Sequence, residues 1–253
     1  MEQIYPKRNK GFSGQAIRLA AICAMLCDHI LVTIAPEHSW LTYIGRIAFP
    51  LFAFLVAEGF YHTTSRSAYL VRILLLAAIS EIPFDLMRSG KLSDPETQNV
   101  LWTLALGLLT IIAVHYVKTR IDNVVATGAA AVAAATFTMY LADDLLTDYY
   151  GYGVLTVLLF YIMRDLRYEK LGQLFGLTLI NVVWMNGAVV TWHINETALS
   201  LPLQSFALFS LFFIWKYNET RGPDNTILRY MSYAFYPVHM LILALMALNG
   251  IVF

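Results

Sequence analysis

The sequence predicts an all-α bundle of transmembrane helices, about nine spans, with the N-terminus in the cytoplasm and the C-terminus outside. Three observations lead to this prediction. Of the 253 residues, 58% are hydrophobic and only 13% are charged, whereas soluble proteins carry about 25% charged residues. Apolar runs long enough to cross a bilayer recur along the whole chain. The basic residues concentrate in alternate loops. We therefore expect one domain, residues 1–253, in a lipid bilayer.

The apolar runs define the elements in order, because a membrane-spanning helix needs roughly 17–25 such residues. The predicted spans lie near residues 16–35, 41–62, 68–87, 99–117, 123–142, 152–163, 171–192, 199–215 and 229–249. The sixth is short, and we expect "YYGYG" ahead of it to lie partly in the membrane. The polar start "MEQIYPKRNKGFSGQ" lacks the apolar core of a signal peptide, so we expect the first span to direct insertion.

The distribution of lysine and arginine sets the predicted orientation. Only Arg88 and Lys91 fall in outer segments, and Arg46 falls inside a span. The cytoplasmic segments and helix ends would hold Lys7, Arg8, Lys10, Arg18, Arg66, Arg72, Lys118, Arg120, Arg164, Arg167, Lys170, Lys216, Arg221 and Arg229. This asymmetry satisfies the positive-inside rule at every loop. The 17 basic residues balance 17 acidic ones, so bulk charge indicates no nucleic-acid partner.

Ionisable residues inside the predicted spans are the main functional signal, because each one costs free energy in a membrane. Asp28 and His29 lie in the first span, Arg46 in the second, Glu81 in the third and His239 in the last. A rise of about 1.5 Å per residue puts Asp28 and Glu81 about 4–5 Å outward of their span midpoints, Arg46 about 8 Å outward and His239 near the centre. Four helices thus place ionisable groups between the bilayer middle and its outer third.

Structural interpretations compete with functional ones for each of these residues. Arg46 could simply pair with Asp28 or Glu81 to hold helices together. Neighbours on a helix point about 100° apart, so we expect Asp28 and His29 to serve different partners. His239 could equally well bond a carbonyl freed near Pro237. We expect no metal site, because His29, His62 and His239 are predicted at different depths or on separated spans.

Several segments together resemble one known family. The runs are "IRLAAICAMLCDHI", "IGRIAFPLFAFLVAEGFYHT", "YLVRILLLAAISEIPFDL", "QNVLWTLALGLL", "DYYGYGVL" and "YAFYPVHMLIL". They resemble the TraX family of integral membrane proteins, which is known for acetylating conjugative pilin and is similar to the wider group of multispan acyltransferases. The resemblance implies a bacterial cytoplasmic-membrane enzyme that uses cytosolic acetyl-coenzyme A (acetyl-CoA) as co-substrate. Its acceptor would be an amine or hydroxyl at the outer face, on a peptide N-terminus or a small molecule.

Acyl transfer requires a base for the acceptor proton and a donor for the developing oxyanion. We assign His29 as base, with His239 in reserve, and Arg46 as electrostatic stabiliser and partner of Asp28. Glu81 is assigned as a support for His29 or Arg46. The phosphates of acetyl-CoA would need inner cations, for which Arg66, Arg72, Arg164, Arg167 and Lys170 are available, although the positive-inside rule alone predicts them. A cationic acceptor would be attracted by Asp85, Asp143 and Asp144, whereas Asp148 is expected to be simply solvated.

Two other classes of function remain open. A proton-coupled transporter or flippase would also line a midplane cavity with Asp, His, Arg and Glu, and helices broken at Pro50 and Pro83 suit one. However, the sequence shows no inverted repeat. A non-catalytic assembly partner for a surface structure would not need this many buried ions. Thioester consumption by the purified protein would separate the enzyme from both.

Overall fold

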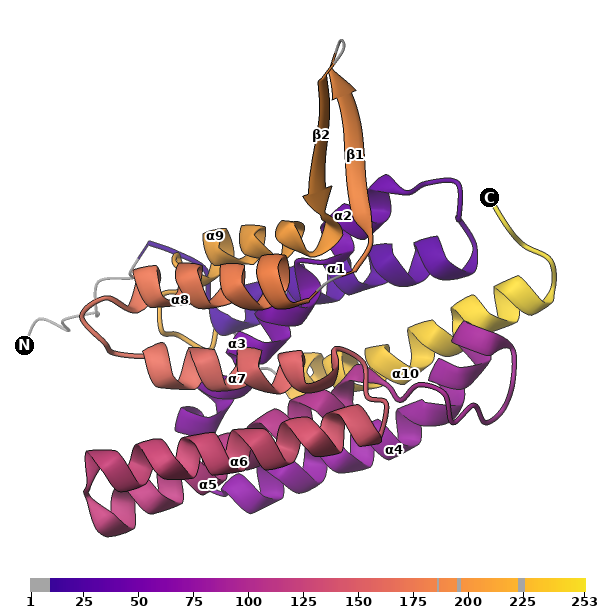
Figure 1. Ribbon diagram of the computed structural model, residues 1–253. Helices are drawn as coiled ribbons and strands as arrows, with labels where there is room; N and C mark the ends of the chain where they lie inside the picture. The colour runs from indigo at the N-terminus through magenta and orange to yellow at the C-terminus, as the bar shows by residue number, and fades with distance from the viewer. Residues whose placement is uncertain (1–9, 186, 195–196, 223–225) are drawn as a thin grey trace, which may run out of the picture.

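The computed structural model describes residues 10–185, 187–194, 197–222 and 226–253, which form a bundle of roughly antiparallel helices (Figure 1). This description does not include Lys7, Arg8 or the side chain of Arg229, three of the basic groups expected on the cytoplasmic side. The first seven helices and the last one are α1 (Gly14–Thr33), α2 (Trp40–Gly45), α3 (Ala48–His62), α4 (Arg66–Ser89), α5 (Val100–Ile121), α6 (Val124–Asp144), α7 (Tyr150–Met163) and α10 (Thr226–Leu248). Between α7 and α10 lie α8 (Glu169–Thr178), η1 (Leu179–Trp184), β1 (Val189–Ile194), β2 (Thr197–Pro202), η2 (Leu203–Phe209) and α9 (Ser210–Ile214).

Four of the long helices begin where a polar side chain accepts a backbone N–H. Ser13, Ser65, Asn99 and Asn123 each accept one from the first turn of α1, α4, α5 and α6, respectively. These bonds satisfy groups that have no partner within the helix. At the other end of α4, Gly90 takes a left-handed conformation with φ 73°, which glycine adopts without steric cost.

The helices have the length and composition of membrane spans. Five helical segments of the described chain are long and apolar enough to cross a bilayer: α1, Trp40–His62, α5, α6 and Tyr230–Leu248 of α10. Helix α6 exposes Val125, Val132 and Phe137 on its outer surface, as expected for a face in contact with lipid. The chain is therefore an integral membrane protein in character. The count of nine spans and their orientation stay predictions.

The region after α8 departs from the all-α prediction. Residues 171–192 and 199–215 were expected to be two spans, but the helix ends at Trp184 and β1 pairs with β2 in an antiparallel hairpin, with Val189 opposite Pro202. The hairpin projects from the bundle (Figure 1). The segment "VVTWHI" is rich in β-branched residues, which favour strands. Hydropathy alone does not distinguish such a run from a helix.

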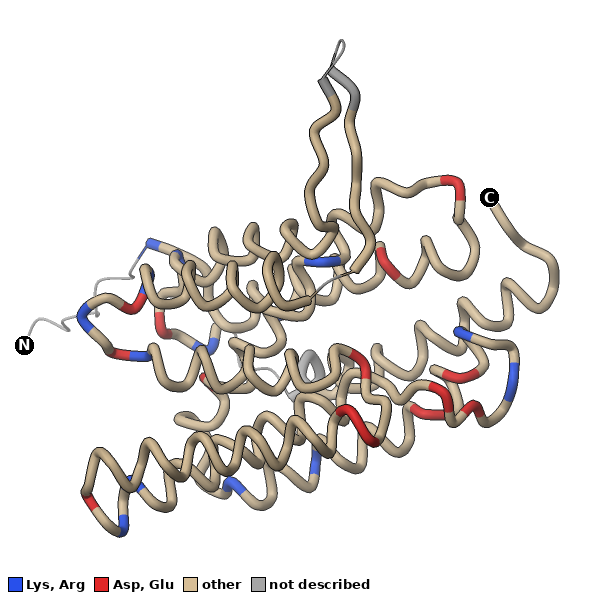
Figure 2. The backbone as a smooth tube through the Cα atoms, in the orientation of Figure 1, with Lys and Arg blue, Asp and Glu red and all other residues tan. Residues whose placement is uncertain are grey.

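Two hydrophobic cores position the functional residues. The larger is built mainly from α3, α5 and α7, and includes Leu51, Leu108 and Val157. The smaller joins α1, α4 and α10, and includes Met25, Phe84 and Met240. Most Lys and Arg residues gather at the end of the bundle where α7 joins α8, and acidic residues gather near the α4–α5 and α6–α7 connections (Figure 2). The bundle is thus electrostatically asymmetric along its axis.

Candidate functional site

Two adjoining cavities lie among α1, α3, α4, α5 and α10. The larger has a volume of about 510 Å³ and the smaller about 40 Å³. Both are lined by Met25, Phe52, Val100 and Tyr236, so these four side chains form the junction between them. The larger volume falls within the range of about 300–1,000 Å³ that is typical of ligand pockets. A ligand in the large cavity would therefore reach the wall of the small one.

The small cavity collects polar residues from separate parts of the chain. Asp28 and His29 come from α1, Gly45 from α2, and Asp148 and Tyr149 from the α6–α7 loop. These residues belong to the Asp-His pair, the "GRIAFP" segment and the "DYYGYG" segment that the sequence had singled out. The fold thus brings three distant motifs to one cavity wall.

The predicted ion pair between Arg46 and Asp28 is present. Nη2 of Arg46 lies 2.5 Å from Oδ2 of Asp28, and the Thr42 hydroxyl donates to Oδ1 at 2.9 Å. Nε of Arg46 is buried and has no hydrogen-bond partner within the described residues. An unpaired buried donor costs free energy unless it gains a partner. The Nε–H group of Arg46 is therefore an unsatisfied donor.

Gly45 allows this pair to form. A Cβ added at position 45 would lie 2.5 Å from Cβ and 2.6 Å from Oδ1 of Asp28, closer than side chains approach one another. The glycine before Arg46 is therefore required by the close approach of α2 to Asp28.

The two intramembrane histidines contact each other, although the sequence placed them at different depths. Nδ1 of His29 lies 2.7 Å from Nε2 of His239, and the rings stack with centroids 5.0 Å apart. Nδ1 of His239 lies 2.7 Å from the Phe235 carbonyl oxygen on its own helix. The depth argument that separated these residues is wrong, because it assumed untilted spans centred in the bilayer. Even so, the described residues contain no group of three metal-ligating side chains.

The hydrogen-bond chain fixes the proton positions of the neutral rings. The Phe235 carbonyl can only accept, so Nδ1 of His239 carries the proton and its Nε2 is an acceptor. Nδ1 of His29 must then donate to that Nε2, which leaves Nε2 of His29 with a free lone pair. His29 lines the small cavity, whereas His239 is 5% exposed and lines neither of the two cavities. The arrangement suits His29 as base and His239 as its orienting partner.

Glu81 has partners other than those predicted. Its carboxylate accepts from the Trp102 indole at 2.7 Å and from the backbone and side-chain amides of Asn99. Asn99 is fully buried and also donates to the Ala77 carbonyl at 2.9 Å. The predicted support of His29 or Arg46 is therefore replaced by a link between α4 and the start of α5. A carboxylate inside the bundle needs hydrogen-bond donors, and the sequence did not indicate that Asn99 and Trp102 would supply them.

The acidic residues of the outer rim differ from their predicted roles. Asp85 is 4% exposed and accepts the Asp94 backbone N–H at 2.9 Å, and Asp143 accepts that of Gly151 at 2.8 Å. Both carboxylates thus hold loop or helix ends, and neither they nor the exposed Asp144 line either cavity. Among these four outer acidic residues, only Asp148 lines the small cavity. It is the one that was expected to be simply solvated.

Asp148 sits in a strained loop. Leu146, Tyr149 and Tyr150 have φ values of 51°, 64° and 47°, a conformation that costs about 1–3 kcal/mol for a non-glycine residue. Burial raises the pKa of the Asp148 carboxyl above its usual range, and the positive charges of Arg46 and Arg88 oppose that shift. Strain of this kind persists where the surroundings hold it, as the Phe49 ring does by stacking on Tyr149 at 3.9 Å.

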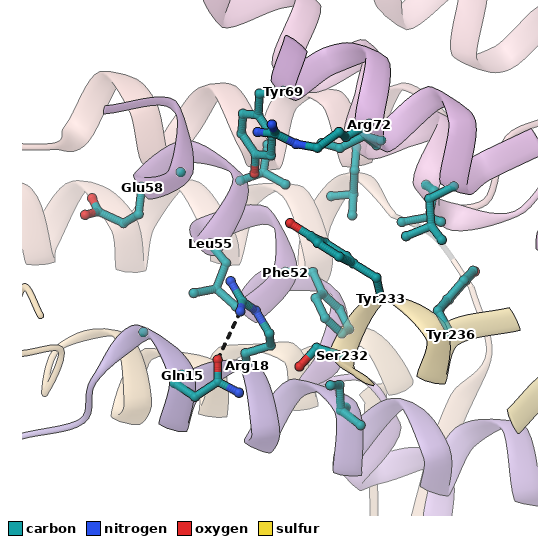
Figure 3. A pocket seen from close by; sticks show the side chains of 18 of the residues that line it. Gln15, Arg18, Phe52, Leu55, Glu58, Tyr69, Arg72, Ser232, Tyr233 and Tyr236 are labelled. Carbon is teal, nitrogen blue, oxygen red and sulfur yellow. Dashed lines mark hydrogen bonds between the residues drawn. The ribbon is translucent and has the colours of Figure 1, made fainter. Parts of the chain in front are cut away.

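Among the predicted phosphate-binding cations, only Arg72 lines the large cavity. Arg66 stacks on Phe60, Arg164 pairs with Glu58 at 2.7 Å, and Arg167 stacks on Tyr168; Lys170 is exposed and also lies off the wall. Arg18 and Arg221, which the sequence analysis did not select, line the cavity as well. Figure 3 shows Arg18 extending from α1 and Arg72 from α4 across the Tyr69 ring, with Tyr233 of α10 between them.

Comparison with known proteins finds one matching protein family and two similar proteins, described below. A family model described as "TraX protein" matches residues 13–247. The chain is 28% identical over 256 residues to the probable fimbrial assembly protein FimC, serogroup H1, of Dichelobacter nodosus, with 93% of this chain and 96% of that protein covered. It is 26% identical over 163 residues to the uncharacterized protein RP591 of Rickettsia prowazekii (strain Madrid E), covering 64% and 59%. No solved structure matches.

Proposed function

The chain belongs to the TraX family, and we propose that it is a membrane-embedded acyltransferase that moves an acetyl group from acetyl-CoA to an amine or hydroxyl. The observation that carries the proposal is the hydrogen-bond chain from Phe235 through His239 to His29. It leaves an unprotonated imidazole nitrogen on a residue of the small cavity, next to a larger cavity bordered by arginines. A positioned base beside a ligand-sized pocket is what acyl transfer requires.

The large cavity is the proposed site of the donor. Arg18, Arg72 and Arg221 would face the phosphates of acetyl-CoA, for which arginine is well suited. The pantetheine arm would pass Leu55 and Leu104 toward the junction at Phe52 and Tyr236. In this proposal the protein lies in the bacterial cytoplasmic membrane with the basic end of the bundle in the cytoplasm, so that the donor enters from the cytosol.

The chemistry then takes place at the junction of the cavities. The acceptor nitrogen or oxygen bonds to the thioester carbonyl carbon, and the carbon–sulfur bond breaks. The acceptor proton passes to Nε2 of His29 and then to the departing thiolate of CoA, so that protons and charge balance. Arg46 lines neither cavity; it holds Asp28, and its positive charge would stabilise the developing oxyanion through the cavity wall, since buried charges act strongly at short range.

The acceptor is proposed to approach from the end that carries Asp148. Asp28 is neutralised by Arg46, whereas the hydrogen bond to the Asp148 carboxylate comes from the Tyr149 backbone N–H at 3.1 Å. That leaves Asp148 available to a cationic group, such as the amine of a peptide N-terminus. The name of the Dichelobacter relative, a fimbrial assembly protein, favours a pilin-like peptide among such acceptors, with a small surface molecule as the other candidate.

The direct test is release of CoA from acetyl-CoA by the purified protein in lipid nanodiscs. We expect acceptor-dependent release by the wild type and a loss of about 10²–10⁴ in rate for His29→Ala, the usual effect of removing a general base. His38→Ala is the matched control, because His38 is exposed in the α1–α2 loop and should leave the rate unchanged. Acceptor or proton flux across the bilayer without thioester consumption would instead indicate a transporter.

A further inference from the structure

The small cavity is too small for most acyl groups. Its volume is about 40 Å³; Phe49, Phe52, Phe84, Ala48 and Gly45 line its apolar part, and Asp28, His29, Asp148 and Tyr149 line its polar part. A cavity needs about 10–15 Å³ on this measure to hold one water molecule, so there is space for only a few atoms. It lies directly beyond the junction that a thioester in the large cavity would reach.

We propose that the apolar part of the small cavity, beside Phe84, is the acyl pocket of the enzyme and that Phe84 limits the donor to a two-carbon acyl group. This inference rests on the proposed function, since it concerns the donor of that reaction. It assigns to the cavity the methyl end of the acetyl group, with the carbonyl carbon at the junction lined by Phe52 and Tyr236. Longer acyl chains would have to displace packed side chains.

Phe84 is the wall best placed to set the length limit. It lines the small cavity but not the large one, and it is 4% exposed, packed in a core with Ala48 and Tyr236. Phe52 lies at the junction, and Phe49 stacks on Tyr149 and supports the strained loop. Truncation of either would therefore disturb more than the pocket. Gly45 forms another part of the wall, but it is already without a side chain.

Protein interiors are close-packed and yield little to extra atoms. A hydrophobic pocket typically discriminates about 10–200-fold for one methylene. We therefore expect the wild type to use acetyl-CoA at least tenfold better than butyryl-CoA by kcat/KM. Phe84→Ala should open the cavity toward the core between α1, α4 and α10, and so admit the longer chain.

The experiment measures CoA release from acetyl-, propionyl- and butyryl-CoA for the wild type, Phe84→Ala and Phe84→Leu, with one acceptor. We expect the butyryl-to-acetyl ratio of kcat/KM to rise at least tenfold in Phe84→Ala, with a smaller rise in Phe84→Leu. Because both substrates are measured on one preparation, the ratio does not depend on the folded fraction. Phe54→Ala is the matched control, since Phe54 is equally buried but packs on Phe160 and lines neither cavity; its ratio should equal that of the wild type.

Two results would overturn the inference while leaving the proposed function intact. One is an unchanged ratio in both Phe84 variants with acetyl transfer retained, which would place the acyl group elsewhere. The other is a change in the KM of the acceptor with an unchanged butyryl-to-acetyl ratio, which would assign the space beside Phe84, like Asp148, to the acceptor. A wild type that releases no CoA from any of the three thioesters would contradict the proposed function itself.

Discussion

The two ends of the adjoining cavities differ in how tightly their charged residues are held. At the small cavity, each ionisable side chain of α1 has a partner on another element: Asp28 pairs with Arg46 and His29 with His239. At the basic end of the large cavity, Arg18 and Arg72 make local contacts among the described residues. Arg18 donates to Gln15 one turn away, and Arg72 lies over the Tyr69 ring on the same helix. The first group is preorganised, and the second is free to rearrange around a ligand.

This difference decides what each group can do. Preorganised charges in a dry site act strongly on a reaction without reorganising. Arginines at a cavity mouth bind phosphate well through charge-assisted hydrogen bonds. For the proposed function, the comparison therefore favours chemistry at the junction beside the small cavity and donor capture in the large one, and substitutions at the two ends should change different kinetic constants.

Among substitutions of arginine, the largest effect is expected from Arg46→Lys. Lysine keeps the charge but loses the planar fork that holds a carboxylate and leaves a further N–H free. We expect kcat to fall about 100-fold, because the Asp28 carboxylate and the electrostatics of the site would be disturbed, with little change in the KM for acetyl-CoA. Steady-state kinetics of CoA release on folded, membrane-inserted protein measure both. Wild-type turnover by the lysine variant would remove Arg46 from the catalytic role.

A smaller and different effect is expected at the basic end. Replacing both Arg18 and Arg72 with glutamine should raise the KM for acetyl-CoA about tenfold or more, since hydrogen bonds to charged groups are worth about 1.5–3 kcal/mol and 1.4 kcal/mol is tenfold. The kcat should stay within a few-fold of the wild-type value. Arg167→Gln removes the same charge from an exposed residue that stacks on Tyr168 outside the cavity. If that control raised the KM equally, general electrostatics would explain the effect.

The smallest effect on catalysis is expected at Glu81, which links α4 to the start of α5 and lines neither cavity. Asn99→Ala removes a partner of the Glu81 carboxylate and leaves it under-satisfied, which should cost about 1–3 kcal/mol of stability. Thermal unfolding in detergent measures the loss, and turnover per folded molecule should stay close to that of the wild type. A large loss of turnover with unchanged stability would return Glu81 to the catalytic group.

The low polarity of the membrane explains why the sequence predicted both the helical bundle and the ionisable residues inside it. Ionisable residues in a membrane must be paired, so the sequence alone indicated Asp28 and Arg46 as partners. The contact between His29 and His239 was missed because depth counted along each span ignores tilt and unequal helix ends. The role of Asp148 was missed because an aspartate in an outer loop has no distinguishing pattern, although the adjoining "DYYGYG" was a signal of an unusual loop.

The basic end was less predictable. The positive-inside rule places arginines at every cytoplasmic loop whatever the function, so composition gave no reason to prefer Arg18 and Arg221 over Arg66, Arg164 and Arg167. Only packing separates them, because Arg164 is engaged by Glu58 and Arg66 by Phe60. The hairpin β1–β2 was hidden for a related reason, since its apolar strands have the hydropathy of a helix.

The central claim is that His29 is the base and that His239 positions it. It is tested most directly by the rate of CoA release in His29→Ala, His239→Ala and His239→Gln, measured with one acceptor on folded protein. We expect His29→Ala to lose about 10²–10⁴ in rate and His239→Ala to lose less. His239→Gln should recover much of the loss, because an amide can accept from His29 and donate to the Phe235 carbonyl at once. An inactive His239→Gln beside an active His29→Ala would contradict the account and make His239 the base.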